Sequence, residues 1–415
     1  MRERGGIESF RGLKIVAGVA ALVVSAGVAS ACGAPKSASS SPAASTGAPE
    51  KPPKPISLTI LDGGGDLKGG GQAAVDAFVK ANPDLVSSVT YQTAAGTDVT
   101  GKLKAQQTGG SVDTSLVLGG PDVLGAAVAQ HVLLQQIPGQ SAGLPDLAGI
   151  QDAGRTGFQN MADGYGLLID YDQNGPFLDY NASAVNASEV PKTPEALLAW
   201  AKAHPARFAY AAPNNSGSGR SFIEALPYLL GDSDPADPVS GWTKTWDYLK
   251  QLGQYVSSYP TSSTLLAQQF GTGQLQMIPT VVSHDISFRK SKTYPATTGI
   301  SLLADQVWIT DGHYAMIPAG VSPQTLYVDL KLESYLVSDQ AQVQRLTNGV
   351  LTSANKNVTI DDAGPEVTSF VQQWGRPDFF PTALESGSVH TPLTPAKLQQ
   401  AFDLWQRNVG SKVGG

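Results

Sequence analysis

The distribution of apolar residues divides the chain into an apolar N-terminal run, a polar tract and a long patterned body. Residues 15–31 are an unbroken run of apolar and small residues, whereas residues 33–55 contain no aliphatic side chain larger than Ala. From Ile56 onward, apolar residues recur with the periods of strands and helices. The polar tract is too poor in apolar side chains to form a core, so we predict a flexible tether there and a folded body from Ile56.

Strand and helix patterns alternate at the start of the body. The β-branched, alternating segments predict strands at 56–61, 86–93 and 115–118. Helical periodicity predicts a helix within 72–83, and Pro121 is placed as the first residue of another. Such alternation indicates an α/β fold with mostly parallel sheets, which bind ligands at the carboxyl ends of their strands.

The middle of the chain continues this alternation. Residues 164–183 are apolar and aromatic and are predicted to be extended. Thr193 is a suitable N-cap for a helix, and residues 208–211 form a short predicted strand. The S-x-x-E pattern of Ser221 and Glu224 is typical of a capping box, so a further helix is expected to begin there.

The N-terminus has the pattern of an export signal, because the apolar run follows basic residues at positions 2, 4, 11 and 14. A transmembrane anchor is the alternative, although the run is short and rich in Ala and Gly. The net charge is −7, and removing residues 1–31 (four basic, two acidic) makes it −9. An acidic body argues against nucleic acid or an anionic membrane surface as the main partner.

Cys32 is the only cysteine of the chain, so no internal disulfide can form. A buried or free thiol is one explanation. However, Ala29-Ser30-Ala31-Cys32-Gly33 resembles a lipobox, the processing site of bacterial lipoproteins, with Ala29 where Leu is usual. This resemblance implies a signal peptide at 1–31, a lipid on Cys32 and a tether at 32–55, with the body at the extracellular face of the membrane.

Two segments resemble the type II extracellular solute-binding proteins of bacterial ABC importers. They are KTPEALLAWAKAHPARFAYAAP (192–213) and DGHYAMIPAGVSPQTLYVDLKLESYLVSDQAQ (311–342). The resemblance implies two α/β lobes joined by crossing strands, with the ligand in a cleft between them, and it places the crossings within 167–181 and 307–317. It places lobe one at 56–175 with about 303–345, and lobe two at 176–302 with about 346–415.

The resemblance also implies a function and a set of partners. We expect a monomer that captures a small solute, passes it to an ABC permease in the membrane, and needs no cofactor or metal. Alternatives are a sensor or adhesion lipoprotein with the same fold and a secreted hydrolase. The chain shows no G-x-S-x-G motif and no metal-binding histidine spacing, so an enzyme is not expected. Asp311 and His313 are expected to be surface or satisfied polar groups.

The loop 214–221 is the first candidate for ligand contacts, because it joins a strand to a helix N-terminus. Its hydroxyls and the Arg220 guanidinium suit a carboxylate, phosphonate, phosphate or sugar hydroxyl, and we expect Arg220 and Ser218 to contribute to binding. An ordinary polar turn capped by Ser221 is the alternative. Glycine-rich turns after strands and aromatic residues near the crossings add further candidates. The alternatives are a flexible surface loop for the glycine-rich turns and structural packing for each aromatic residue. The full set is Gly65, Asp66, Gly120, Tyr171, Asn215, Ser216, Ser218, Arg220, Ser221, Trp308 and Tyr314.

Overall fold

The computed structural model describes residues 47–136, 146–346 and 351–412. The predicted signal peptide, Cys32 and most of the predicted tether lie outside these residues. The last tether residues, from 47 onward, contact the body: the backbone N–H of Glu50 donates to the Pro323 carbonyl, and Pro52 is buried. None of the helices in the described part of the chain is long and apolar enough to cross a membrane.

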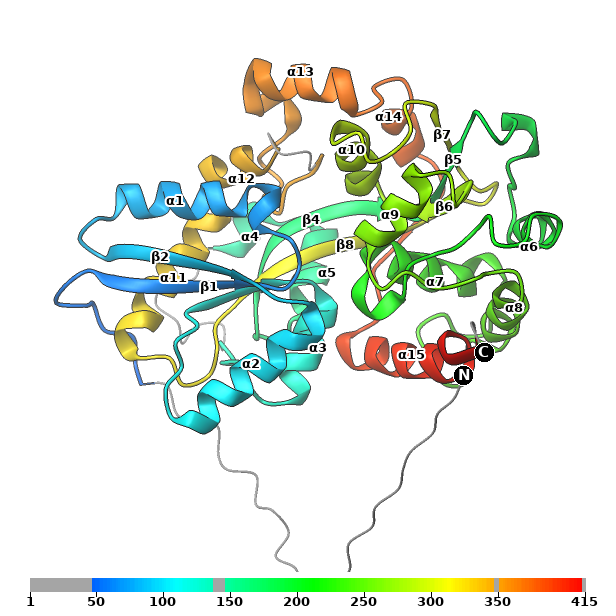
Figure 1. The fold of residues 1–415 in the computed structure, drawn as a ribbon. Coiled ribbons are helices and arrows are strands. Elements are labelled where there is room, and N and C mark those ends of the chain that lie inside the picture. Colours follow the sequence, from blue (N-terminus) through cyan, green and yellow to red (C-terminus); the bar gives the residue numbers. More distant parts are fainter. Residues whose placement is uncertain (1–46, 137–145, 347–350, 413–415) are drawn as a thin grey trace, which may run out of the picture. The chain divides into compact units, whose positions relative to one another are not determined.

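The body contains two β-sheets (Figure 1). Sheet 1 has the order β2-β1-β3-β8-β4, and β9 pairs with β8. β1 pairs in parallel with β2 and β3, whereas β8 is antiparallel to β3 and β4. Its strands are β1 (Ile56–Asp62), β2 (Val86–Thr93), β3 (Leu116–Gly119), β4 (Leu167–Gly175), β8 (Val307–Met316) and β9 (Ser388–His390).

Helices cover both faces of sheet 1, and the alternation of apolar residues along its strands explains why. On β3, Leu116 and Leu118 belong to the core under α1 and α11, whereas Val117 belongs to the core on the opposite face, with α2, α3 and α5. The helices are α1 (Gln72–Ala81), α2 (Gly96–Gly109), α3 (Pro121–Ala129), α4 (Leu147–Ile150), α5 (Ala153–Met161) and α11 (Pro323–Leu336).

Sheet 2 has the order β6-β5-β7, and both pairings are antiparallel. Its large core includes Trp242 and Trp246 and packs helices α6 to α9 and α15 around one face. Val282 and Ile286 of α10 contribute to a second cluster with Phe177 of β5. The elements are β5 (Phe177–Asn181), β6 (Met277–Thr280), β7 (Thr298–Ser301), α6 (Pro194–Ala203), α7 (Gly217–Leu229), α8 (Thr243–Gly253), α9 (Ser263–Gly271) and α10 (Val282–Lys290).

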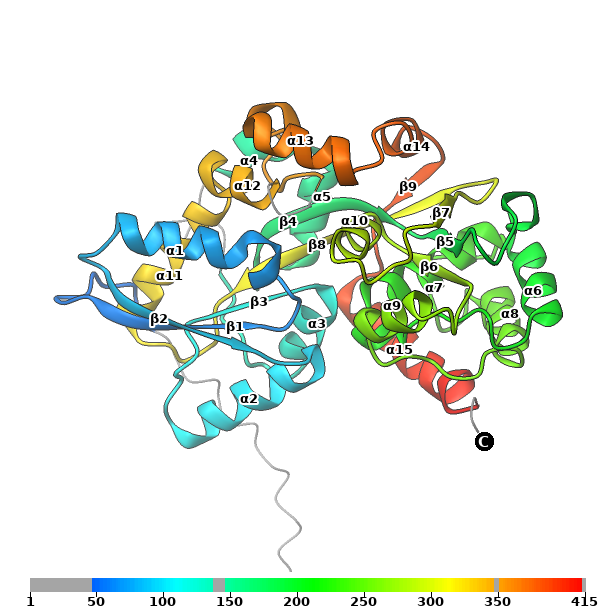
Figure 2. The ribbon, with the colours of Figure 1, turned by 45° about the horizontal axis from the view of Figure 1, so that its top comes forward.

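Two chain crossings join the sheets, as the sequence predicts. The chain leaves sheet 1 at the end of β4 and enters sheet 2 with β5, and it returns from β7 to β8. β4 and β8 are the long paired strands of Figure 2. The expectation of mostly parallel sheets holds for β1 with β2 and β3 and for the short pair of β8 with β9. The crossing strand β8 is antiparallel to β3 and β4, and sheet 2 is antiparallel, because strand pairing is not contained in local periodicity.

The C-terminal helices divide between the two sheets. Val367 of α13 packs with Leu346 of α12, and Phe380 of α14 packs with Phe177 of β5. α15 inserts Phe402 and Trp405 into the sheet 2 core and also contacts α3 (Figure 1). These helices are α12 (Asp339–Leu346), α13 (Gly364–Trp374), α14 (Phe380–Leu384) and α15 (Pro395–Asn408).

Local capping signals were partly sufficient to place the helices. Pro121 opens α3, and the Thr193 side chain caps α6 as predicted. The predicted start at Ser221 is wrong: α7 begins at Gly217, because Ser216 has an extended backbone and its hydroxyl accepts the Gly219 N–H. The predicted strand at 208–211 is reduced to a single bridge at Phe208.

Candidate functional site

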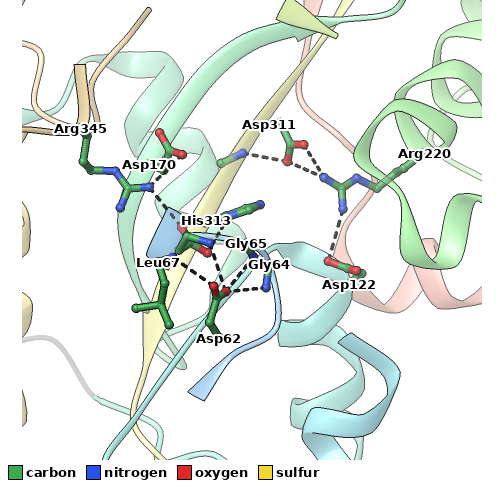
Figure 3. Close-up of polar contacts among 12 residues, drawn as sticks. Asp62, Gly64, Gly65, Leu67, Asp122, Asp170, Arg220, Asp311, His313 and Arg345 are labelled. Atoms are coloured by element: carbon green, nitrogen blue, oxygen red, sulfur yellow. Dashed lines mark hydrogen bonds and ion pairs between the residues drawn. The ribbon is translucent and has the colours of Figure 1, made fainter. Parts of the chain in front are cut away.

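After β1, the chain forms a loop that is held by the side chain of Asp62, the last residue of the strand. Asp62 Oδ1 accepts the N–H groups of Gly64, Gly65 and Asp66 at 2.9, 2.7 and 3.1 Å, and Oδ2 accepts that of Leu67 at 3.0 Å (Figure 3). Gly65 has a φ of 89°, which favours glycine. Burial and the neighbouring Asp66 raise the pKa of Asp62 against the lowering effect of these bonds. The loop thus wraps its backbone donors around one carboxylate.

Asp66 is the centre of a buried ion-pair cluster. His313 of β8 contacts Asp66 Oδ2 through Nδ1 at 2.8 Å, and Arg345 Nη2 of α12 lies 3.1 Å from Oδ1. The same nitrogen lies 3.0 Å from Asp170 of β4. Burial alone would raise the pKa of Asp66, but the charges and hydrogen bonds of His313 and Arg345 lower it to about 2. The cluster ties the β1 loop to both long strands (Figure 3).

The ligand-type atoms of Asp66, Asp170 and His313 lie within 4.8 Å of one another, close enough to hold a metal ion. Two features argue for the ion-pair arrangement instead. Arg345 already bridges both carboxylates through one nitrogen. Burial would lower the pKa of His313, but Asp66 and its hydrogen bond raise it to about 10, so the imidazole carries the proton that a metal would have to displace.

A second cluster centres on Arg220 in the first turn of α7. Arg220 Nη2 lies 2.5 Å from both carboxylate oxygens of Asp311 on β8, and Nη1 lies 3.3 Å from Asp122 Oδ1 in the first turn of α3 (Figure 3). Arg220 is only 4% exposed, so these bonds form in a poorly hydrated environment. Despite its burial, Asp311 and Asp122 raise the pKa of the guanidinium. Arg220 therefore links the sheet 2 helix α7 to the sheet 1 helix α3.

Two further titratable groups lie beside Arg220. Glu224, one turn along α7, accepts the Leu393 N–H at 2.7 Å, and burial raises its pKa to about 7. His284 of α10 is near Asp311 and Arg220, and burial lowers its pKa to about 4, so it is neutral at pH 7. The charged groups around Arg220 at neutral pH are therefore mainly carboxylates.

The predicted serine loop is internally satisfied. The hydroxyl of Ser216 lies 2.7 Å from that of Ser263 and 3.1 Å from that of Ser218. Ser218 and Ser221 are each 1% exposed. Asn215 donates its side-chain amide to the Thr261 carbonyl at 2.8 Å. These side chains hold the loop against α9.

The remaining predicted residues fall into two groups. Gly120 caps α3 beside the His313 ring, where it joins Gly65, Asp66 and Arg220 near the two clusters. The aromatic candidates are engaged elsewhere. Tyr171 stacks with Arg155, and the fully buried Trp308 and Tyr314 bond to the carbonyls of Ser386 and Phe158. The latter two are core residues of this structure.

Several cluster residues were not candidates in the sequence. Asp122, Asp170 and Arg345 carry no local motif. Asp311 and His313 are expected from the sequence to be surface or satisfied polar groups; both form ion pairs, but their place at the centre of the clusters is not predicted. The one available signal was the position of Asp311-Gly312-His313 on a predicted crossing strand.

A cavity of about 180 Å³ opens beside the Arg220 cluster. It lies between α2 and α3 on one side and α15 and the segment before α7 on the other. Its lining residues are Gly96, Asp122, Ala126, Asn214, Gln399, Phe402, Asp403 and Gln406. They come from both sheets' helices, so the cavity belongs to the same cleft as Arg220. A cleft that is lined from both sides by polar, charged and aromatic side chains is suited to binding a small ligand.

Comparison with known proteins gives the family. Residues 73–369 match the family model of the bacterial extracellular solute-binding proteins. The chain belongs to this family. A search of curated proteins gives no significant match.

Solved structures share the fold of this solute-binding protein at low identity. An ABC transporter structure from Clostridium perfringens aligns over 86% of this chain and 100% of its own, with a TM-score of 0.60 and 13% identity. Iron-bound HitA from Pseudomonas aeruginosa aligns over 86% of this chain and 100% of its own, with a TM-score of 0.60 and 17% identity. The GacH receptor of Streptomyces glaucescens, described in complex with acarbose, aligns over 85% of this chain and 98% of its own, with a TM-score of 0.58 and 15% identity. The fold is that of the two-lobe type II periplasmic binding proteins.

Proposed function

We propose that this solute-binding protein captures a small solute in the cleft between its two lobes and delivers it to an ABC permease. Lobe one is centred on sheet 1 and lobe two on sheet 2. The supporting observation is the contact of Arg220 in α7 with Asp122 in α3, next to a cavity lined from both sides. Such an arrangement allows lobe closure to be coupled to occupancy of the cleft.

The crossings are the natural hinge. β4 continues into β5, and β7 leads back to β8, so opening can occur with these strands intact. Across the cleft, the contacts to be changed are the Arg220 ion pair with Asp122 and the packing of α15 on α3. A solute that bridges both sides would favour the closed arrangement by the difference in its affinity for the two states.

We further propose that the mature protein is anchored through a lipid on Cys32, functions as a monomer and has no catalytic role. Three acyl chains, at about 0.8 kcal/mol per buried CH₂, would hold the body at the extracellular face of the membrane. The acidic residues left after removal of the N-terminal segment agree with a protein that stays off the anionic lipid surface.

A thermal-shift screen of the exported, full-length mature protein tests the binding function. Sugars, amino acids, polyamines, phosphonates and thiamine-like cations form the panel. A solute bound only by the folded protein raises the midpoint by mass action, by about 2.7 kcal/mol of stability at 100 times its Kd. Scattering measurements should show closure with the same solute. A panel in which no solute shifts the midpoint or changes the scattering profile would contradict the proposal.

Replacing Cys32 with Ser tests the anchor separately. The variant is expected to appear in the medium or to remain uncleaved, whereas the parent protein fractionates with membranes. Normal processing and membrane retention of the Ser variant would refute lipidation at this position while leaving the binding function untouched.

A further inference from the structure

We propose that the solute is a small organic cation, carrying an ammonium or guanidinium group, which binds in the 180 Å³ cavity against Asp122 and Asp403. The inference rests on the proposed binding function and narrows it to a substrate class. It follows from two observations: the groups of the cleft that could bind an anion already bond to carboxylates of the chain, and carboxylate oxygens that line the cavity make no such bonds among the described residues.

Two backbone sites of the cleft that would suit an anion already hold carboxylates of the chain. In the β1 loop, Asp62 receives four backbone N–H groups. At the start of α7, Asp311 bonds to Arg220, and a Cβ atom placed on Gly217 would lie 3.3 Å from its Oδ2. Asp311 therefore occupies the helix N-terminus that would otherwise receive a solute carboxylate or phosphate.

The cationic side chains of the described cleft are also engaged. Arg220 bonds to Asp311 and Asp122, and His313 bonds to Asp66. Arg345 holds Asp66 and Asp170, and its remaining nitrogens are buried beyond the reach of a solute in the cavity. An anionic solute would have to displace an internal carboxylate and leave it buried without a partner, which is costly.

The cavity itself offers acceptors. Asp122 uses only Oδ1 for Arg220, and its Oδ2 faces α2, 3.4 Å from a Cβ atom placed on Gly96. The carboxylate of Asp403 has no hydrogen bond or ion pair among the described residues. Side-chain amides and one aromatic ring complete the polar and apolar surface for an amine with a short carbon chain, from Asn214, Gln399, Gln406 and Phe402.

The charge balance favours a cation. Two acidic residues, Asp122 and Asp403, line the cavity, whereas Arg220 and Asp311, which pair with each other, do not line it. No lysine, arginine or histidine lines the cavity within the described residues. The volume is below the 300–1,000 Å³ or so typical of larger ligand pockets, which fits a solute of modest size.

Isothermal titration calorimetry on the mature protein tests the class. The probes are 1,4-diaminobutane and agmatine as cations, succinate and inorganic phosphate as anions, and maltose as a neutral solute. We expect at least one cation to bind, more weakly as NaCl is raised, and neither anion to bind. If only an anion or maltose binds, the cation assignment is overturned and the binding function stands. If none of the probes and none of the solutes in the thermal-shift screen binds, both fail.

Substitutions locate the site. Asp403→Asn removes a carboxylate that makes no internal contact and should weaken the bound cation by about tenfold, while Asp122→Asn should weaken it by roughly 10- to 100-fold. Asp378→Asn, an exposed carboxylate outside the cavity, is the matched control and should leave the affinity unchanged. Asp403→Asn is decisive, because Asp122→Asn also removes a partner of Arg220. A cation that binds Asp403→Asn with the parent affinity would place the site elsewhere.

Discussion

Two sets of carboxyl groups are almost equally buried in this protein but differ in their surroundings. Asp66 in the cleft is 3% exposed and contacts two cationic side chains, His313 and Arg345. Asp329 and Glu333 lie one turn apart on α11 and are both 0% exposed, and no cationic side chain among the described residues pairs with them. The Glu333 carboxylate accepts hydrogen bonds from the side-chain amide of Gln136, at 3.2 and 3.0 Å.

The comparison shows that partners, rather than burial, decide the charge of a buried carboxyl group. His313 and Arg345 overcome desolvation and lower the pKa of Asp66. On α11, desolvation prevails: it raises the pKa of Glu333 to about 8 and that of Asp329 well above its ordinary value. The cleft therefore contains fixed charges where loops and strands meet, and the core of lobe one contains neutral acids.

The largest expected effect comes from removing a cationic partner of Asp66. Arg345→Ala leaves Asp66 buried with only His313, so we expect the free energy of unfolding to fall by about 3–5 kcal/mol at pH 7. Urea or guanidinium unfolding measures the loss. Lys250→Ala is the control, because its pair with Asp247 is well exposed and should contribute only about 0–1 kcal/mol. Equal losses in the two variants would show that the cleft cluster has no special role in stability.

For the buried acids of α11, we expect an intermediate effect on stability that depends on pH. A raised pKa means that the folded protein binds the Glu333 proton more tightly than the unfolded chain. Its contribution to stability is therefore present below pH 4.5 and is lost as the pH rises to about 8, by up to about 1.4 kcal/mol per pH unit. Glu333→Gln removes this dependence and should gain stability over the parent protein as the pH rises. Unfolding titrations at pH 4.5, 6 and 8 measure the difference.

The charged set should behave in the opposite way under acid. Because the folded pKa of Asp66 is lowered from 3.8 to about 2, its contribution is present above pH 3.8 and is lost as the pH falls through that interval. Glu333→Gln should leave this acid loss unchanged. If the free energy of unfolding of Glu333→Gln varied with pH as that of the parent does between pH 4.5 and 8, the assignment of a neutral acid at Glu333 would be contradicted.

Much of the fold was predictable because its signals are local. Strand alternation at 56–61, Pro121 as a first helical residue and Thr193 as an N-cap each depend on a few neighbouring residues, and the structure confirms them. The extended pattern at 164–183 also matches β4 and β5, and the family resemblance implies a crossing between the lobes in this segment. Strand direction was not predictable, because it depends on which strands pair.

The site was less predictable because its contacts are distant in sequence. Arg220 was identified as a functional candidate, but its partners Asp311 and Asp122 lie 91 and 98 residues away. A local motif also favoured the wrong serine: Ser221 and Glu224 fit a capping box, yet Ser216 caps the helix. Nothing in the sequence around Trp308 distinguishes an aromatic residue in the core from one in a cleft.

The smallest expected loss of stability is that of Ser216→Ala, which tests whether location in the cleft or charge decides how much a side chain stabilises the protein. Ser216 lies in the cleft loop but is neutral, and its hydroxyl caps α7 through the Gly219 N–H at 3.1 Å. Ser216→Ala should therefore cost about 1 kcal/mol, the ordinary value for an N-cap. Ser262→Ala, which removes the equivalent cap of α9, is the control and should cost a similar or somewhat smaller amount, because the Ser216 hydroxyl also contacts those of Ser218 and Ser263. If Ser216→Ala lowers the free energy of unfolding as much as Arg345→Ala does, position in the cleft matters more than ion pairing. If the two serine variants lose similar small amounts, the larger loss in Arg345→Ala is due to charge.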